Sequence, residues 1–239
     1  MRVPILCYHR VEVPPAGSES DTNFVTPAQF ASHLSALSRL GFQGVTVGAL
    51  IRWQRAEQTL PARPIAITFD DAYASVTSQA LPALAKHGWP CTVYAVSSYV
   101  GARNVWDPGA PPSTLLNATA LRALVRDGHD VGSHTRHHRR VRGLSAADAH
   151  EELAGARDDL EQLLGVPCES VAFPYGSHDR ETLERTREAG YAAALTLKRW
   201  GNGRRTNPWR LGRMSVGGPL SSGMLVAKLV KCLLTPSVS

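Results

Sequence analysis

The chain has 239 residues, of which 43% are hydrophobic, and carries a net charge of +6. This length is enough for one sizeable core, so we expect one domain spanning 1–239. The positive charge favours an anionic partner such as a sugar phosphate, an acidic polymer or a membrane surface. No long Lys/Arg block and no nucleic-acid-binding motif is present, which argues against nucleic acid.

The cellular location is predicted from two further features. The apolar run at the N-terminus is too short for a signal peptide, and no segment approaches the length of a membrane-spanning helix. The four cysteines are widely spaced, without a C-x-x-C pair, and are expected to be free thiols. These features predict a cytoplasmic protein.

Strand and helix signals alternate along the whole chain. Strands are predicted at 4–8, 43–47, 65–69, 91–96, 129–133, 170–173 and 192–196, and helices at 27–40, 48–57, 75–86, 118–127, 146–164 and 180–189. Two helix starts have capping boxes, at Thr26–Gln29 and Ser145–Asp148. Repeated β-then-α units predict a parallel sheet, and this many units in one core favour an α/β barrel.

Polar side chains follow several of these strands directly. They are His9, Asp70, Asp71, His134 and Tyr175. Barrel enzymes place their chemistry at the carboxyl ends of the strands, where these residues are expected to meet. The Gly/Pro-rich segment 101–116, with Trp106, is a long loop of the kind that shapes a substrate groove.

The acids and the later histidines together predict a hydrolytic metal site. One carboxylate of Asp70–Asp71 and two imidazoles supply three ligands and leave a position open for water, as in catalytic zinc sites. The spare carboxylate is then a general base. The second imidazole belongs to His137 or His138, and the four-residue spacing from His134, one helical turn, favours His138.

Two nearby segments add to the prediction. The break at Pro174–Tyr175–Gly176 presents a backbone N–H that is suited to a developing oxyanion. Four arginines crowd the loop after His134, namely Arg136, Arg139, Arg140 and Arg142. They form either a solvated basic loop or a surface that recruits an anionic substrate or a phospholipid.

Three motifs identify a resemblance. Thr68–Tyr73, Gly132–His138 and Phe173–Gly176 resemble the first three motifs of the polysaccharide deacetylase family, which includes chitooligosaccharide deacetylases. Further segments resemble the branch that acts on poly-β-1,6-N-acetylglucosamine, namely Leu6–Val11, Phe24–Phe30 and Trp209–Val216. The similarity covers nearly the whole chain in the expected order.

The resemblance implies a distorted (β/α)7-type barrel and the removal of N-acetyl groups from an amino sugar in a polysaccharide or oligosaccharide. Asp71, His134 and His138 would bind one divalent ion, most often zinc, with cobalt, nickel or manganese as alternatives. Asp70 would be the base, and the Tyr175 N–H would bind the oxyanion. The alternative substrate is a cytoplasmic lipid-linked or nucleotide-linked amino sugar.

The chain also departs from the family pattern. Ala172 stands where many members have an arginine that orients the catalytic aspartate, and Arg213 replaces the histidine that serves as general acid. The branch resemblance assigns the acid to His9, with His178 as the alternative. The residues expected to contact substrate are Tyr8, Trp106, Pro174 and Arg213.

The tail 221–239 is apolar with two lysines. It is predicted to be either the final helix of the barrel or a helix that lies on a membrane surface.

Overall fold

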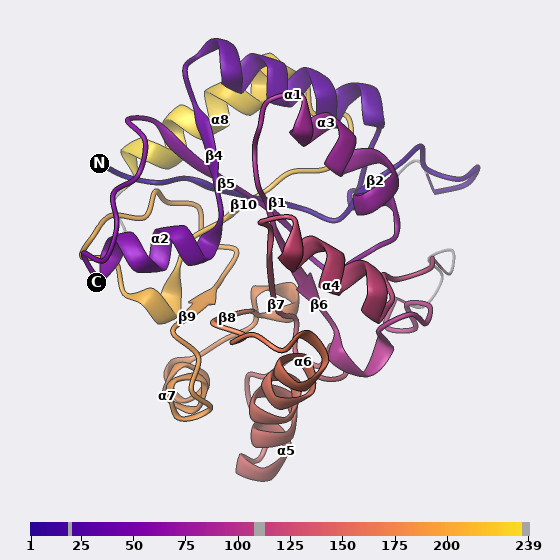
Figure 1. Cartoon of the computed structure of the whole chain (residues 1–239), viewed down its shortest axis with the longest axis vertical. Coiled ribbons are helices and arrows are strands. Elements are labelled where there is room, and N and C mark those ends of the chain that lie inside the picture. Colours follow the sequence, from indigo (N-terminus) through magenta and orange to yellow (C-terminus); the bar gives the residue numbers. More distant parts are fainter. Residues whose placement is uncertain (19–20, 108–112, 236–239) are drawn as a thin grey trace.

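The computed structural model describes residues 1–18, 21–107 and 113–235 (Figure 1). Its main sheet has eight parallel strands in the order β10-β1-β5-β6-β7-β8-β9, with β4 beside β5. The strands are β1 (Ile5–Tyr8), β4 (Gln43–Val45), β5 (Pro64–Phe69), β6 (Thr92–Ala95), β7 (Asp130–Ser133), β8 (Ser170–Ala172), β9 (Ala193–Leu195) and β10 (Met214–Ser215). A second small sheet pairs β2 (Arg10–Val11) with β3 (Phe24–Val25).

The main sheet curls until one segment joins its two edges. Leu211 forms a bridge with Leu195 of β9, and Met214 pairs with Leu6 of β1. The segment between them therefore links the last strand to the first. This arrangement confirms the predicted distorted (β/α)7-type barrel in a single domain.

Helices follow most of the strands and cover the outside of the sheet (Figure 1). They are α1 (Pro27–Arg39), α2 (Val47–Gln54), α3 (Leu81–Ala85), α4 (Ala118–Arg126), α5 (Ala146–His150), α6 (Ala156–Leu164), α7 (Arg180–Glu188) and α8 (Ser222–Leu234). Four shorter helical turns are η1 (Val76–Ala80), η2 (Ser97–Tyr99), η4 (Pro174–Gly176) and η5 (Pro208–Arg210). The predicted elements are thus present, with boundaries that differ by a few residues.

The predicted caps form as the sequence indicates. The side chains of Thr26 and Ser145 accept hydrogen bonds from the backbone of Gln29 and Asp148. The helix expected over 146–164 is interrupted, however, by a π-helical turn, η3 (Glu151–Gly155). Such turns are frequent at functional sites, and this one carries the buried side chain of Glu152.

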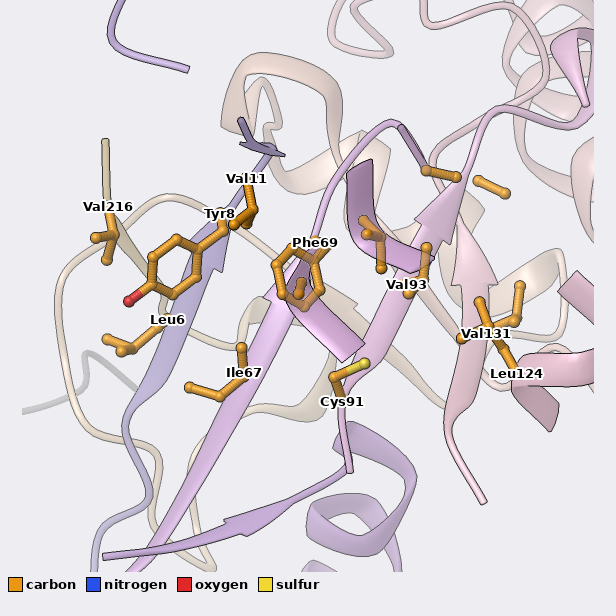
Figure 2. Packing of buried hydrophobic residues seen from close by; sticks show 14 of the residues in the cluster. Leu6, Tyr8, Val11, Ile67, Phe69, Cys91, Val93, Leu124, Val131 and Val216 are labelled. Atoms are coloured by element: carbon orange, nitrogen blue, oxygen red, sulfur yellow. The ribbon is translucent and has the colours of Figure 1, made fainter. Parts of the chain in front are cut away.

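The largest apolar cluster lies between the sheet and its helices (Figure 2). Tyr8 is wholly buried in it, packs edge-on against Phe30 and places its hydroxyl 3.2 Å from His33 Nδ1. The expectation that Tyr8 contacts substrate is therefore wrong. Strands of a parallel sheet are apolar on both faces, so the sequence pattern does not reveal that this ring points toward α1.

Gly132 in β7 carries a packing requirement just before the first histidine. A Cβ atom there would lie 2.8 Å from the backbone oxygen of Ser170 and against the ring of the buried Tyr94. Gly132→Ala is expected to lower the free energy of unfolding by about 1–3 kcal/mol, because the backbone oxygen has little freedom to move. The matched control is Gly223→Ala in α8, where a Cβ meets nothing within 4 Å and stability is expected to hold or rise. Equal denaturant midpoints for both variants would contradict the prediction.

The C-terminal helix belongs to the fold. Figure 1 shows α8 beside α1, and the buried residues Leu225, Leu229 and Cys232 lie on it. This confirms the interpretation of the tail as the final helix, for the part up to residue 235. No helix in the described ranges is long and apolar enough to cross a membrane.

All four cysteines are buried free thiols, as expected.

Candidate active site

The parallel sheet brings the polar residues of several strands to one edge. Asp70 and Asp71 follow β5, and its neighbour β1 leads to His9. On the other side of β5, beyond β6, the strands β7 and β8 lead to His134 and Tyr175. The register pairs Tyr8 with Phe69, so His9 and Asp70 start their loops side by side. The shared position predicted for these residues is the one they occupy.

Asp71, His134 and His138 form a compact buried group. Asp71 Oδ1 lies 3.2 Å from His138 Nε2 and 3.5 Å from His134 Nε2. The three residues are 3%, 2% and 7% exposed, and their ligand atoms all lie within 4.8 Å of one another. This is one carboxylate and two imidazoles, converging from two strand ends.

The loop that carries the histidines is not a helix. Residues 134–138 are irregular, and Thr135 and His138 have positive φ of 66° and 60°. The reason given for preferring His138, one turn of helix, is therefore wrong. The loop nevertheless turns the ring of His138, and not that of His137, toward Asp71.

Glu152 binds His137, the histidine that does not face Asp71. His137 Nδ1 lies 2.9 Å from Glu152 Oε1, and the His137 backbone N–H donates to Glu152 Oε2 at 3.0 Å. Glu152 is wholly buried and sits on the π-helical turn η3. Sequence reasoning missed it, because nothing in the pattern of 146–164 distinguishes this acid from its solvent-facing neighbours.

Arg213 is the main correction to the predicted site. It is wholly buried and forms a two-point ion pair with Asp70, with Nη1–Oδ1 at 2.6 Å and Nη2–Oδ2 at 2.8 Å. The expectation that Arg213 contacts substrate is therefore wrong, because the side chain is fully buried. It orients Asp70, the task that the resemblance gives to an arginine at the position of Ala172.

The electrostatics keep both aspartates ionised. Burial by itself raises the pKa of Asp70, but the Arg213 guanidinium and His134 outweigh it and leave this pKa well below its usual value. Burial also raises the pKa of Asp71, but the neighbouring imidazoles of His138 and His134 outweigh it, so this pKa is lowered as well. Burial lowers the pKa of His134 to about 4, so this imidazole is neutral near pH 7.

These residues fit a divalent metal ion. His134 Nδ1 lies 2.7 Å from the Ala172 carbonyl oxygen, which can only accept a hydrogen bond, so Nδ1 carries the hydrogen and the lone pair of Nε2 faces Asp71. The buried atom Asp71 Oδ1 has no hydrogen-bond partner among the described residues. An ionised carboxylate with two neutral imidazoles is a donor set that suits zinc and its neighbours in the first transition series.

The two candidates for the general acid lie in different places. The ligand atoms of Cys7, His9 and Asp70 are within 4.8 Å of one another, and His9 is partly exposed. His178 instead bonds the Gly176 carbonyl at 2.8 Å and stacks on Phe173, in a separate cavity. The geometry therefore favours His9 for chemistry beside Asp70.

The turn after β8 borders the group on one side. Tyr175 has a positive φ of 59°, is 44% exposed, and places its ring 5.0 Å from that of His138. Its backbone N–H donates to no acceptor found in the described ranges. Pro174 is buried, which contradicts its expected contact with substrate and leaves it the task of fixing the turn.

Trp106 also contacts the metal-ligand group. Its half-buried ring stacks on His138 at 4.5 Å between centroids, and its Nε1 has no partner in the described part of the chain. Its contact with substrate stays a prediction, and the structure places Trp106 beside the metal-ligand group. Residues 108–112 of the predicted groove loop lie outside the described residues.

Backbone strain gathers at this edge of the sheet. Five of the six non-glycine residues with positive φ in the described chain lie in its loops, namely Asp71, Ala72, Thr135, His138 and Tyr175. Each such residue costs on the order of 1 kcal/mol and persists where the surrounding structure enforces it, typically at functional sites.

The arginines of the histidine loop divide into two groups. Arg136 pairs with Asp159 at 2.9 Å, and Arg139 pairs with Asp148 at 2.9 Å. Arg140 instead lies over the Tyr175 ring at 3.9 Å, beside the candidate site. Arg142 also lies near an acid, with its Nε 3.8 Å from Asp179 Oδ2. Three of the four arginines are thus paired with acids, and Arg140 is the one in contact with Tyr175.

Comparison with known proteins decides the family. A family model described as polysaccharide deacetylase matches residues 57–194. The chain belongs to this family. The match includes Asp70, Asp71, His134, His138 and Tyr175.

Relatives of this polysaccharide deacetylase are distant in sequence. YxkH of Bacillus subtilis, named as a polysaccharide deacetylase, is 22% identical over 92% of this chain and 73% of its own length. A chitooligosaccharide deacetylase of a Bradyrhizobium species is 26% identical over 55% of this chain and 54% of its own length. A poly-β-1,6-N-acetyl-D-glucosamine N-deacetylase of Staphylococcus epidermidis is 23% identical over 77% and 65%. The chain therefore spans only part of these relatives.

Solved structures share the fold. The deacetylase PplD of Streptococcus pyogenes has a TM-score of 0.83 at 19% identity and covers 96% of this chain and 98% of its own. IcaB of Ammonifex degensii has a TM-score of 0.77 at 24% identity, covering 95% and 97%.

Proposed function

We propose that this protein is a metal-dependent hydrolase that removes N-acetyl groups from an amino sugar in a polysaccharide or oligosaccharide. The observation that carries the proposal is the buried group of Asp71, His134 and His138 with the ionised Asp70 beside it. The family and the names of the relatives support this reaction.

Asp71, His134 and His138 would hold the ion, with zinc as the best match to their donor atoms. When bound, a divalent ion would polarise the amide carbonyl and acidify a water molecule. Cobalt, nickel and manganese are accommodated by the same donor types.

The remaining steps belong to the protein's own side chains. Asp70 would take the proton of the attacking water, and Arg213 would keep its carboxylate ionised and aimed. The Tyr175 N–H would donate to the oxyanion of the tetrahedral intermediate. His9 would then protonate the nitrogen as the carbon–nitrogen bond breaks, which gives acetate and a free amine.

The names of the relatives support the proposed class of substrate. Those reported above are named for polysaccharides, oligosaccharides or poly-β-1,6-N-acetyl-D-glucosamine. A lipid-linked or nucleotide-linked intermediate is therefore not favoured. Contact with a membrane through the tail stays a prediction, which the exposed apolar side chains of Met224, Val230 and Leu234 on α8 support.

The activity is tested by acetate release from N-acetylglucosamine oligomers of β-1,4 and β-1,6 linkage. Release from one of them, preferably the β-1,6 oligomer, is the expected result. No release from either, by protein that binds one metal ion per chain, would contradict the proposal.

The general acid is tested by a pair of histidine variants. His9→Ala is expected to lower kcat by about a hundredfold or more, because the leaving amine then lacks its proton donor. His178→Ala, in the separate cavity, is expected to change kcat less than threefold. The reverse ranking of the two variants would transfer the role to His178.

A further inference from the structure

The residues that follow Tyr175 line a cavity. It has a volume of about 640 Å³ and begins at Gly176, the residue after Tyr175. Its wall contains four basic side chains and one histidine, namely Arg142, Arg180, Lys198, Arg210 and His178, with Asp179 as the acid. The residue before Gly176, Tyr175, has its ring 5.0 Å from that of His138 in the metal-ligand group.

The acid in the wall, Asp179, already has partners. Asp179 Oδ1 caps α7 by accepting hydrogen bonds from the backbone and side chain of Thr182, both at 2.8 Å. Its other oxygen lies 3.8 Å from Arg142. Little of this carboxylate is therefore left to neutralise the other cations.

Two of the cations have no acidic partner. Arg180 pairs with Glu184 at 2.9 Å, but no carboxylate oxygen of the described residues lies within 4.0 Å of Lys198 or Arg210. Arg210 lies over the Trp200 ring at 5.5 Å, which limits where its guanidinium can go. Arg140, also without an acidic partner in the described ranges, lies over Tyr175 at the boundary with the site.

The charges around the cavity affect the pKa of His178. Burial lowers the pKa of His178, and the charges of Arg210 and Lys198 lower it further, whereas the bond to the Gly176 carbonyl and the charge of Asp179 oppose this shift. Cations that line one cavity without counter-charge repel one another, and an anion between them would relieve the repulsion.

We propose that this cavity is a subsite for an anionic group of the substrate, a carboxylate or a phosphate on a sugar near the one that loses its acetyl group. The inference rests on the proposed function, because it extends that site along the bound saccharide. Lys198 and Arg210 would contact the anion, and Arg140 would guide it past Tyr175. The enzyme would thus prefer an acidic N-acetylated saccharide to a neutral one.

The test compares substrates that differ only in charge. Acetate release is measured with an N-acetylated oligosaccharide that carries a carboxylate on one sugar, with its methyl ester, and with the same oligosaccharide phosphorylated instead. The acid is expected to have a kcat/KM about tenfold above that of the ester, the effect of one good charge-assisted contact. A still higher value for the phosphorylated substrate would identify phosphate as the group, and a lower one would identify carboxylate.

Charge variants assign the effect to the cavity. In Lys198→Gln and Arg210→Gln, the ratio of kcat/KM for acid over ester is expected to fall toward one. Lys86→Gln is the matched control, because this exposed lysine lies between the end of α3 and the start of β6 and is not among the residues that line the cavity. It should leave the ratio unchanged.

Two results would overturn the subsite. One is equal kcat/KM for acid and ester in the unaltered protein, which would leave the proposed deacetylase standing. The other is an equal loss for both substrates in Lys198→Gln. Calorimetric binding of the acid separates the two proposals, because binding that Lys198→Gln weakens, without acetate release from any substrate, would support the subsite and contradict the deacetylase.

Discussion

Asp70→Asn is expected to lower kcat by about 10²–10⁴-fold, the range for removal of a positioned general base. The asparagine side chain keeps the size of the aspartate but cannot take the proton of the attacking water. Asp70 faces Arg213 with both oxygens, whereas Asp71 faces the two imidazoles. The variant should therefore still bind one metal ion per chain, as measured by elemental analysis after dialysis.

Asp71→Asn and His134→Ala provide the contrast for this result. Each removes one of the three proposed ligands, so metal and activity should be lost together. Substantial activity in Asp70→Asn would refute the role of Asp70 as base. Loss of metal in Asp70→Asn, with metal retained in Asp71→Asn, would exchange the roles of the two aspartates.

Arg213→Met is expected to lower the free energy of unfolding by about 3–5 kcal/mol, because it leaves the buried Asp70 carboxylate without its partner. The activity should fall as well, since the base is no longer held in one orientation. Urea denaturation followed by fluorescence measures the first effect, and acetate release measures the second. Arg213→Lys keeps the charge but loses the two-point contact, so its stability and activity are expected to lie between those of the unaltered protein and Arg213→Met.

The double variant Asp70→Ala/Arg213→Met separates the ion pair from the packing of the arginine. With both charges removed, the stability should recover most of the loss seen in Arg213→Met, while the activity stays absent. A double variant no more stable than Arg213→Met would show that the packing of the arginine, and not the unpaired carboxylate, causes the loss.

The sequence predicts this fold well because its signals are local. Caps such as Thr26–Gln29 and Ser145–Asp148 fix helix starts, and the alternation of strands and helices dictates a parallel sheet. That topology alone then places Asp70, Asp71 and His134 at one edge. The position of these residues was predictable for this reason.

What the sequence does not reveal depends on distant contacts. Arg213 lies 143 residues from Asp70, and no spacing rule connects them. The choice between His137 and His138 is made by the strained loop and by Glu152, 15 residues from His137. The position of Tyr8 could not be predicted either, because a strand buried on both faces gives no sign of which side chains turn toward the helices.

The most direct test of the central claim is a zinc titration of the metal-free protein, with acetate release from the preferred N-acetylglucosamine oligomer as the readout. We expect no release without metal, and a rate that rises linearly and levels off at one zinc ion per chain. Full activity in the metal-free protein, or a rate indifferent to zinc while one ion binds, would contradict the account of Asp71, His134 and His138 as the metal ligands of a deacetylase.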